Sequence, residues 1–296
     1  MQATLNTTKV AVKNVLVPVD FSPASKNALT MALAIAGAYG AKVHLVHAIT
    51  LNEYPVALPE GIPPNVEMVR RLSEENMAKL EKIVKDSGVK YETVLEAGTI
   101  WDVISDDLRK KKIDLVVVGT HAPVGLEKLL AGSVAEEILR AVDCPVMTVG
   151  PHVKPGMLKA GKFHEVLCAN DFRPESLEAI NYAAALAQEH NAHVTLLHVI
   201  EKIEDPAPHA RIRVQMAACE QLKRLVPPDA DLWCDLRYET EFGNPAEAIL
   251  AAALKRPTDL IILSARPVGK MSSHAPWATV SKIVREAECP VLTVRG

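Results

Sequence analysis

The fold is decided by the segment Leu115-Val-Val-Val-Gly119-Thr-His-Ala122-Pro-Val-Gly125-Leu-Glu-Lys-Leu-Leu-Ala-Gly132-Ser133-Val134. Its apolar start has the length of a buried strand, and the residues that follow it up to Val142 place apolar side chains at helical spacing. A glycine loop before a helix suits an anion, because the first N–H groups of a helix have no partner within the helix. The segment therefore predicts an α/β unit with a phosphate-binding loop.

Similar strand and helix patterns surround this segment. Strands are expected at 14–20, 43–49, 91–96, 115–118 and 145–149, and helices at 24–39, 67–87, 98–111 and 134–142. Ser22 is the expected N-cap of the first helix, with Pro23 at its first position. The alternation predicts a parallel sheet that is covered by helices on both faces.

The second half of the chain repeats the first. Val166-Leu-Cys-Ala-Asn-Asp171-Phe-Arg-Pro174 matches Val15-Leu-Val-Pro-Val-Asp20-Phe-Ser-Pro23, and Cys289-Pro-Val-Leu-Thr-Val294 matches Cys144-Pro-Val-Met-Thr-Val149. A repeat of this length indicates a duplicated domain rather than a solenoid. We expect one domain over residues 1–152 and a second over 161–296, joined by a linker at about 151–163.

Composition excludes several classes of function. The net charge of −3 and the 4% aromatic content argue against a nucleic-acid partner. No apolar run is long enough for a membrane span, and the N-terminal residues do not resemble a signal peptide. The five cysteines are scattered without a CxxC pair, which favours reduced thiols in a cytoplasmic protein over disulfides or a zinc site.

With these motifs identified, the chain resembles a tandem universal stress protein. The resemblance covers nearly the whole chain in two copies, and rests on Val17-Pro18-Val19-Asp20, Leu45-Val46-His47-Ala48, Gly132-Ser133 and the two Cys-Pro-Val segments. It implies two open five-stranded parallel sheets flanked by helices, of the adenine-nucleotide α-hydrolase-like, Rossmann-like class. Many members of that family bind ATP, and others do not.

The resemblance also implies an ATP site in the first copy. Asp20 would contact the adenine edge, and Gly132, Ser133 and Val134 would meet the phosphates. The complete set of implied binding residues is Pro18, Val19, Asp20, Ala48, Val118, Gly119, Ala122, Gly132, Ser133 and Val134. A Mg²⁺ ion could accompany the phosphates, although no carboxylate cluster demands one.

The family's ATP-binding loop has a glycine, two residues, a second glycine, nine residues and then Gly-Ser or Gly-Thr. Both copies depart from this pattern. In the first copy Ala122 replaces the second glycine, which we expect to weaken binding about tenfold if positive φ is needed there. In the second copy Ser264 and Pro267 replace both glycines, and Trp277 stands where Gly132 stands. We therefore expect the second half not to bind ATP in the family's manner.

Several single residues have a structural interpretation beside the functional one. In the structural interpretation, Asp20 serves only to stabilise a turn and Ser133 serves only as a helix N-cap. His47 and His198 recur at strand ends, where a packed, hydrogen-bonded histidine is expected more often than a ligand, and His121 is expected to be a solvated loop residue. No arrangement of residues typical of a catalytic site, and no GxxxxGK[ST] or GxGxxG motif, is present.

The sequence thus predicts a stress-response protein whose N-terminal domain binds ATP, with the nucleotide state altering shape or partners. Hydrolysis, if any, would be slow. The alternatives are an ATP-independent interaction or chaperone-like protein and, less favoured, a nucleotidyl-transfer enzyme. Because the last strand of each half is an apolar edge, and such edges pair in the family, we expect the halves to form an intrachain pseudo-dimer. A homodimer beyond that is left open.

Overall fold

The computed structural model describes residues 10–50, 66–120, 133–157, 161–202, 207–226, 235–265 and 275–296, and strands alternate with helices throughout these ranges. The first half contains β1 (Asn14–Pro18), α1 (Pro23–Tyr39), β2 (Lys42–Ile49), α2 (Val66–Asp86), β3 (Lys90–Ala97), α3 (Ile100–Lys111), β4 (Leu115–Gly119), α4 (Ser133–Ala141) and β5 (Val146–Val149). The second half contains β6 (Glu165–Ala169), α5 (Ser176–His190), β7 (His193–Ile200), α6 (Pro208–Arg224), β8 (Asp235–Phe242), α7 (Pro245–Lys255), β9 (Leu260–Ser264), α8 (Ala275–Glu286) and β10 (Val291–Val294).

Local signals account for the ends of helix α1. The Ser22 hydroxyl accepts a hydrogen bond from the Ser25 N–H at 3.2 Å, and Pro23 occupies the first turn, where its missing N–H costs nothing. Gly40 ends the helix with φ at 67°, in the left-handed region that glycine adopts without strain. The expected N-cap, first residue and C-terminal glycine of this helix are all confirmed.

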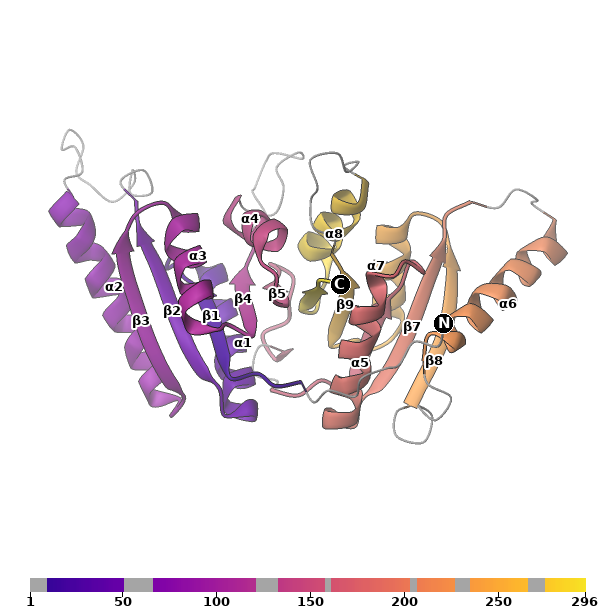
Figure 1. Cartoon of the computed structure of the whole chain (residues 1–296), viewed down its shortest axis with the longest axis horizontal. Coiled ribbons are helices and arrows are strands. Elements are labelled where there is room, and N and C mark those ends of the chain that lie inside the picture. The colour runs from indigo at the N-terminus through magenta and orange to yellow at the C-terminus, as the bar shows by residue number, and fades with distance from the viewer. Residues whose placement is uncertain are drawn as a thin grey trace.

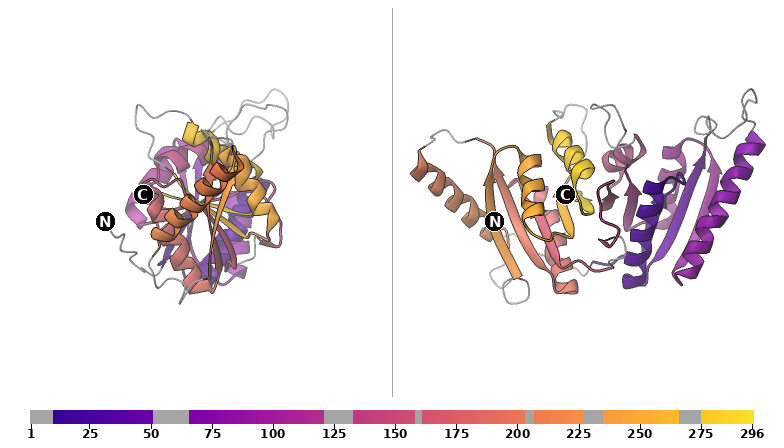
Figure 2. Two further views of the ribbon diagram at one scale, coloured as in Figure 1. Left: turned by 90° about the vertical axis from the view of Figure 1, so that its right-hand side faces the viewer. Right: turned by 180° about the vertical axis from the view of Figure 1, so that it is seen from behind.

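The strands of both halves form one continuous sheet of ten described strands, in the order β3-β2-β1-β4-β5-β10-β9-β6-β7-β8 (Figure 1). Within each half, neighbouring strands are parallel, as predicted. The junction between the halves is the antiparallel pair β5 and β10. Viewed from behind, the two halves lie side by side about this junction (Figure 2).

The junction is nearly symmetric. Met147 pairs with its counterpart Leu292, and Thr148 pairs with Val291 just as Thr293 pairs with Val146. Each threonine hydroxyl donates to the opposite carbonyl, Thr148 to Val291 and Thr293 to Val146, both at 3.1 Å. The pairing removes two apolar edges from water and relates the halves by a pseudo-twofold axis.

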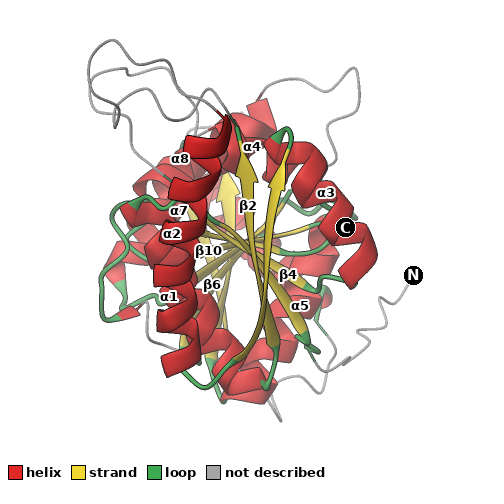
Figure 3. Ribbon diagram, turned by 90° about the vertical axis from the view of Figure 1, so that its left-hand side faces the viewer, coloured by secondary structure: helices red, strands yellow, loops and turns green. Residues whose placement is uncertain are grey.

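The hydrophobic core lies in two layers, one on each face of the sheet. Val15 and Val17 of β1 pack into the layer covered by α1, α2, α5 and α6, whereas Leu16 packs into the layer covered by α3, α4, α7 and α8. This alternation explains why the runs 15–17 of β1 and 115–118 of β4 are apolar at successive positions. Figure 3 shows the strands turning progressively between the two helical layers.

Candidate functional site

Strand order changes direction between β1 and β4 in the first half. The chain passes from β1 into α1 on one face of the sheet and from β4 towards α4 on the other face. In open parallel sheets this change leaves a crevice beside the carboxyl ends of the two strands, where ligands bind. Asp20 follows β1 and Gly119 ends β4, so both predicted site residues lie at this point.

The Asp20 side chain is exposed, and its carboxylate holds the turn into α1. Its Oδ1 atom accepts a hydrogen bond from the Ser22 N–H at 3.0 Å. The turn also contains Phe21, which has φ at 64°, a conformation that is uncommon for a residue with a side chain. A backbone fixed in this way holds Asp20 in a defined position at the carboxyl edge of the sheet.

His47 of β2 fixes the same turn from below. Its Nδ1 atom lies 2.7 Å from the Val19 carbonyl, to which it donates, and Nε2 lies 3.2 Å from the Ser73 hydroxyl. The Phe21 ring packs on the imidazole with 4.3 Å between ring centroids. His47 is 3% exposed, so it is a packed structural histidine, as the sequence predicts.

Gly119 allows an unusually close contact between β4 and α1. A Cβ atom at this position would lie 2.3 Å from the carbonyl oxygen of Ala24, which no side chain could tolerate without a shift of the backbone. The glycine thus brings the first turn of α1 against the end of β4. Sequence analysis did not identify Ala24, since its contribution is a backbone atom.

The remaining predicted residues divide into two groups. Pro18, Val19, Ala48 and Val118 are buried at the carboxyl ends of β1, β2 and β4. Ser133 is the first residue of α4 and Val134 follows it, so their N–H groups belong to the N-terminal turn of that helix. Ala122, Gly132 and His121 lie outside the described residues.

The corresponding point of the second half is built differently. Asp171, the counterpart of Asp20, accepts hydrogen bonds from the Ser176 hydroxyl and from the Arg173 N–H. Ser264 stands where Gly119 stands, and its hydroxyl donates to the Glu175 carbonyl at 3.1 Å. The Arg173 contact repeats that of the Ser22 N–H with Asp20, so the clear difference lies at the end of β9, where Ser264 replaces Gly119. Pro267, another predicted departure, lies outside the described residues.

The turn that carries the aspartate is nevertheless repeated. Phe172 has φ at 63° and packs on His198 with 4.0 Å between ring centroids. His198 Nδ1 lies 2.9 Å from the Asn170 carbonyl, and its pKa is lowered, chiefly because burial disfavours the charged imidazole. Since this arrangement occurs in both halves, it belongs to the fold rather than to the nucleotide loop.

The described residues were also compared with the requirements of a metal site and of a reactive thiol. No group of three or more His, Cys, Asp or Glu side chains there could hold a metal ion. Burial raises the pKa of the Cys144, Cys168 and Cys289 thiols to about 12, which favours the protonated thiol over the nucleophilic thiolate. Cys144 and Cys289 are therefore small packed side chains, as their positions before Pro145 and Pro290 suggest.

Comparison with known proteins gives a consistent result. A family model described as the universal stress protein family matches residues 11–150 and again 162–295. Universal stress protein MJ0531 of Methanocaldococcus jannaschii is 34% identical over 139 residues, which are 46% of this chain and 81% of that protein. Universal stress protein A of Escherichia coli (strain K12) is 35% identical over 114 residues, 38% of this chain and 78% of that protein.

The fold of the whole chain also has a solved counterpart. A universal stress protein from Archaeoglobus fulgidus DSM 4304 superposes with a TM-score of 0.72 at 21% identity, covering 97% of this chain and 98% of that one. Among the described helices, none is long and apolar enough to cross a membrane. With a family model matched twice along its length, the chain belongs to the universal stress protein family.

Proposed function

We propose that the N-terminal half binds ATP at the carboxyl edge of β1 and β4, and that the nucleotide alters the shape or the partners of a cytoplasmic stress-response protein. The observation that supports this most directly is the contact between Gly119 and Ala24, which sets the Asp20 turn beside the end of β4. Two helix N-termini, those of α1 and α4, begin at the same edge of the sheet. Unpaired N–H groups and the helix dipole favour phosphate at such a place.

Several of the predicted residues have a chemical part in this proposal. The Asp20 carboxylate accepts a hydrogen bond from the exocyclic amine of adenine. Val118 and Gly119 lie along the ribose, Ala48 offers a main-chain contact to the base, and the backbone N–H groups at the start of α4 receive the phosphates. Mg²⁺ would travel with the nucleotide rather than be held by a protein cluster.

The second half serves in this proposal as a structural partner that binds no nucleotide. At the end of its strand β9, Ser264 replaces Gly119, and the Ser264 hydroxyl donates to the Glu175 carbonyl. If the first half also fails to bind nucleotide, the same observation favours the second candidate function, an interaction protein that works without ATP.

Mass spectrometry of the gently purified protein, followed by calorimetric titration with ATP, tests the proposal. We expect bound nucleotide, or heat on titration, in the unaltered protein. The double change Gly132→Asp and Ser133→Glu should abolish both, because it places negative charge against the phosphates. An unaltered protein that carries no nucleotide and gives no heat would favour the ATP-independent function.

A matched pair of variants locates the site in one half. Asp20→Ala should weaken ATP binding about tenfold, the size of one lost hydrogen bond to a charged group. Asp171→Ala makes the same change at the corresponding position and should leave the affinity unaltered. Equal losses in the two variants would contradict the assignment of the site to the first half.

A further inference from the structure

Arg295, at the end of the second half, reaches across the domain junction to helix α4 of the first half. Its Nη2 atom donates to the Leu139 carbonyl at 3.2 Å and also to the Arg140 carbonyl. Its Nη1 atom lies 3.2 Å from Asp143 Oδ1. The Arg295 side chain is only 12% exposed, whereas that of Asp143 is 98% exposed, so the two carbonyl contacts are the sheltered ones.

These contacts satisfy carbonyl groups that α4 leaves open. The last four carbonyls of an α-helix have no partner within the helix. In α4 the Ile138 carbonyl accepts from the Val142 N–H at 3.0 Å, and Arg295 serves the next two, Leu139 and Arg140. A guanidinium at this end also complements the negative pole of the helix dipole. The second half therefore caps a helix of the first.

Helix α4 depends on such contacts because it is short. It has nine residues, fewer than a helix needs to be stable alone in water. Ala135, Ile138 and Leu139 pack one face against the sheet. Because the helix is rigid over this length, a cap that holds its C-terminus also fixes the direction of its N-terminal N–H groups, where the phosphates are proposed to bind.

The pseudo-twofold axis supplies an internal comparison. Helix α8 closes in the same way, with the Ala287 N–H donating to the Ile283 carbonyl at 2.9 Å. The position that corresponds to Arg295 is Gly150, which has no side chain to donate. A Cβ atom there would lie 2.8 Å from the Val284 carbonyl, the counterpart of the Leu139 carbonyl. Among the described residues, the guanidinium therefore caps α4, which follows the retained Gly-Ser, whereas the equivalent position beside α8 carries no side chain.

We propose that Arg295 is a positioning residue for phosphate binding, through which the second half holds α4 in the orientation that receives the nucleotide. The inference rests on the proposed ATP site of the first half. It assigns a role to the second half, which binds no nucleotide in this proposal: the second half holds α4 of the first half in place.

The test compares ATP with adenosine, because Arg295 acts on the phosphate end of the ligand only. In calorimetric titrations, Arg295→Ala should weaken ATP binding about fivefold, as expected for one cation at a helix terminus, and leave adenosine binding unchanged. Arg295→Lys keeps the positive charge but lacks the planar set of guanidinium donors. Its ATP affinity should therefore lie between those of the wild type and of Arg295→Ala. Equal losses for ATP and adenosine, or none, would overturn the inference.

Lys154→Ala is the matched control for a general weakening of the junction. Lys154 pairs with Glu288 at 2.7 Å and touches no residue of α4 among the described contacts. We expect it to leave the ratio of ATP to adenosine affinity unchanged, and a shift equal to that of Arg295→Ala would overturn the inference. Hydrogen exchange in the nucleotide-free protein should show α4 amides less protected in Arg295→Ala than in Lys154→Ala, and equal protection would count against it.

These measurements separate the inference from the function on which it rests. A wild-type protein that binds neither ATP nor adenosine overturns both the proposed function and the role of Arg295 in phosphate binding. A wild-type protein that binds ATP, together with an Arg295→Ala variant of unaltered ATP affinity, leaves the function standing and overturns the inference alone.

Discussion

The two halves of the molecule share a chain path but differ where the first and fourth strands of each half end. In the first half Gly119 lets α1 begin at Pro23, against β4. In the second half Ser264 occupies the corresponding place, and α5 begins only at Ser176. The two halves therefore differ both in the residue that ends the fourth strand and in the first residue of the adjacent helix.

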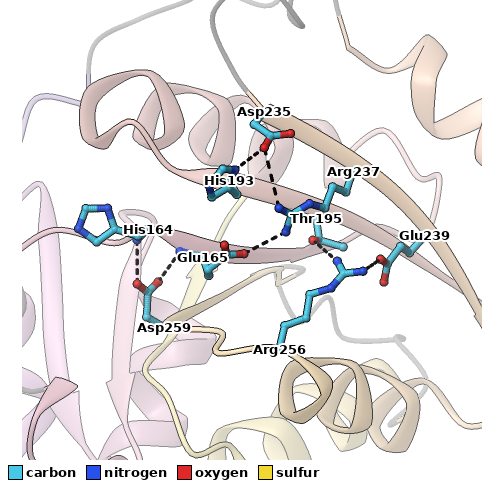
Figure 4. Close-up of polar contacts among 9 residues, drawn as sticks. All are labelled: His164, Glu165, His193, Thr195, Asp235, Arg237, Glu239, Arg256 and Asp259. Carbon is cyan, nitrogen blue, oxygen red and sulfur yellow. Dashed lines mark hydrogen bonds and ion pairs between the residues drawn. The ribbon is translucent and has the colours of Figure 1, made fainter.

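The opposite edge of the sheet shows a different kind of change. In the second half Arg237 lies between two acids, 3.2 Å from Glu165 and 3.9 Å from Asp235 (Figure 4). His193, at the start of β7, also contacts Asp235, and Figure 4 places these groups along the first residues of neighbouring strands. In this cluster a basic residue is the centre and acids surround it.

The first half contains the inverse arrangement. Glu92 stands at the position of Arg237, and it pairs with Lys42 at 2.5 Å and with Lys111. The position of Lys111 is taken in the second half by Arg256, which donates to Thr195 and pairs with Glu239 (Figure 4). Both halves therefore carry complementary charges at this edge, with opposite signs at the centre.

Other features are the same in both halves. The Asp114 carboxylate accepts from the N–H groups of Lys13 and Asn14, and the Asp259 carboxylate accepts from those of His164 and Glu165. Features that recur in both halves hold the fold, whereas those that differ, at the carboxyl edge, are the ones to which function can be assigned.

The largest effect is expected from exchanging the residues at the ends of β4 and β9. Gly119→Ser forces a Cβ atom against the Ala24 carbonyl, so the start of α1 must move, at a cost of about 3 kcal/mol in the free energy of unfolding. Ser264→Gly removes one hydrogen bond and should cost about 1 kcal/mol. Denaturant unfolding of both variants measures the difference. Similar costs would show that the close approach at Gly119 is not what separates the halves.

Lowering the pH should reduce the free energy of unfolding through His190, which lies where the two halves meet. His190 and Tyr39 occupy corresponding positions, and Nε2 of the histidine lies 2.9 Å from the tyrosine hydroxyl, while Nδ1 accepts from the Phe163 N–H at 3.1 Å. Burial, with Lys162 and His164 nearby, lowers the pKa of His190 to about 4. Protonation would remove the acceptor on which Phe163 depends.

The sign of the pH dependence follows from that shift. Between pH 6.5 and about 4 the unfolded chain binds a proton at His190 that the folded chain does not, so stability falls as the pH is lowered through this window. We expect a loss of about 2 kcal/mol from this residue. The loss should be absent in His190→Gln and retained in His209→Gln, which alters an exposed histidine of α6. Unfolding curves from pH 7 to 4.5 that coincide for all three proteins would contradict this.

Much of the fold follows from local sequence signals. The apolar runs at 115–118 and 260–263 predict buried strands, and Ser22 with Pro23 predicts the start of α1, because these effects act between neighbours in the chain. The pairing of β5 with β10 is anticipated from their exposed apolar edges and from the family resemblance.

The contacts that distinguish the halves could not be predicted in this way. Arg295 and Leu139 are 156 residues apart, and Gly119 meets a carbonyl rather than a side chain. Such contacts depend on distances that only the folded chain defines. Alignment of the halves pairs Arg295 with Gly150, a contrast that could have drawn attention to Arg295. The binding roles of Asp20 and Ser133 stay predictions.

A smaller effect is expected from reversing the charge at the centre of each amino-edge cluster. Arg237→Glu places an acid beside Glu165 and Asp235, and Glu92→Arg places a base beside Lys42 and Lys111. Each should lower stability by about 1 kcal/mol, since the groups are only partly buried, and the loss should shrink in high salt. The double variant should lose the sum of the two, because the clusters share no partner. A double variant as stable as the wild type would mean that the clusters are coupled.

The smallest effect concerns the difference between the caps of α4 and α8. Asp143 pairs with Arg295, yet its side chain is 98% exposed, so the attraction is screened by water and should contribute under about 0.5 kcal/mol. The hydrogen bonds of the same guanidinium to the Leu139 and Arg140 carbonyls are part-buried and therefore less screened. Asp143→Ala should therefore match the wild type in unfolding and in hydrogen exchange of α4, while Arg295→Ala exposes those amides. A loss of stability and protection in Asp143→Ala as large as that in Arg295→Ala would mean that the ion pair, not the carbonyl contacts, stabilises α4. The difference between Arg295 and its counterpart Gly150 would then amount to a surface charge alone.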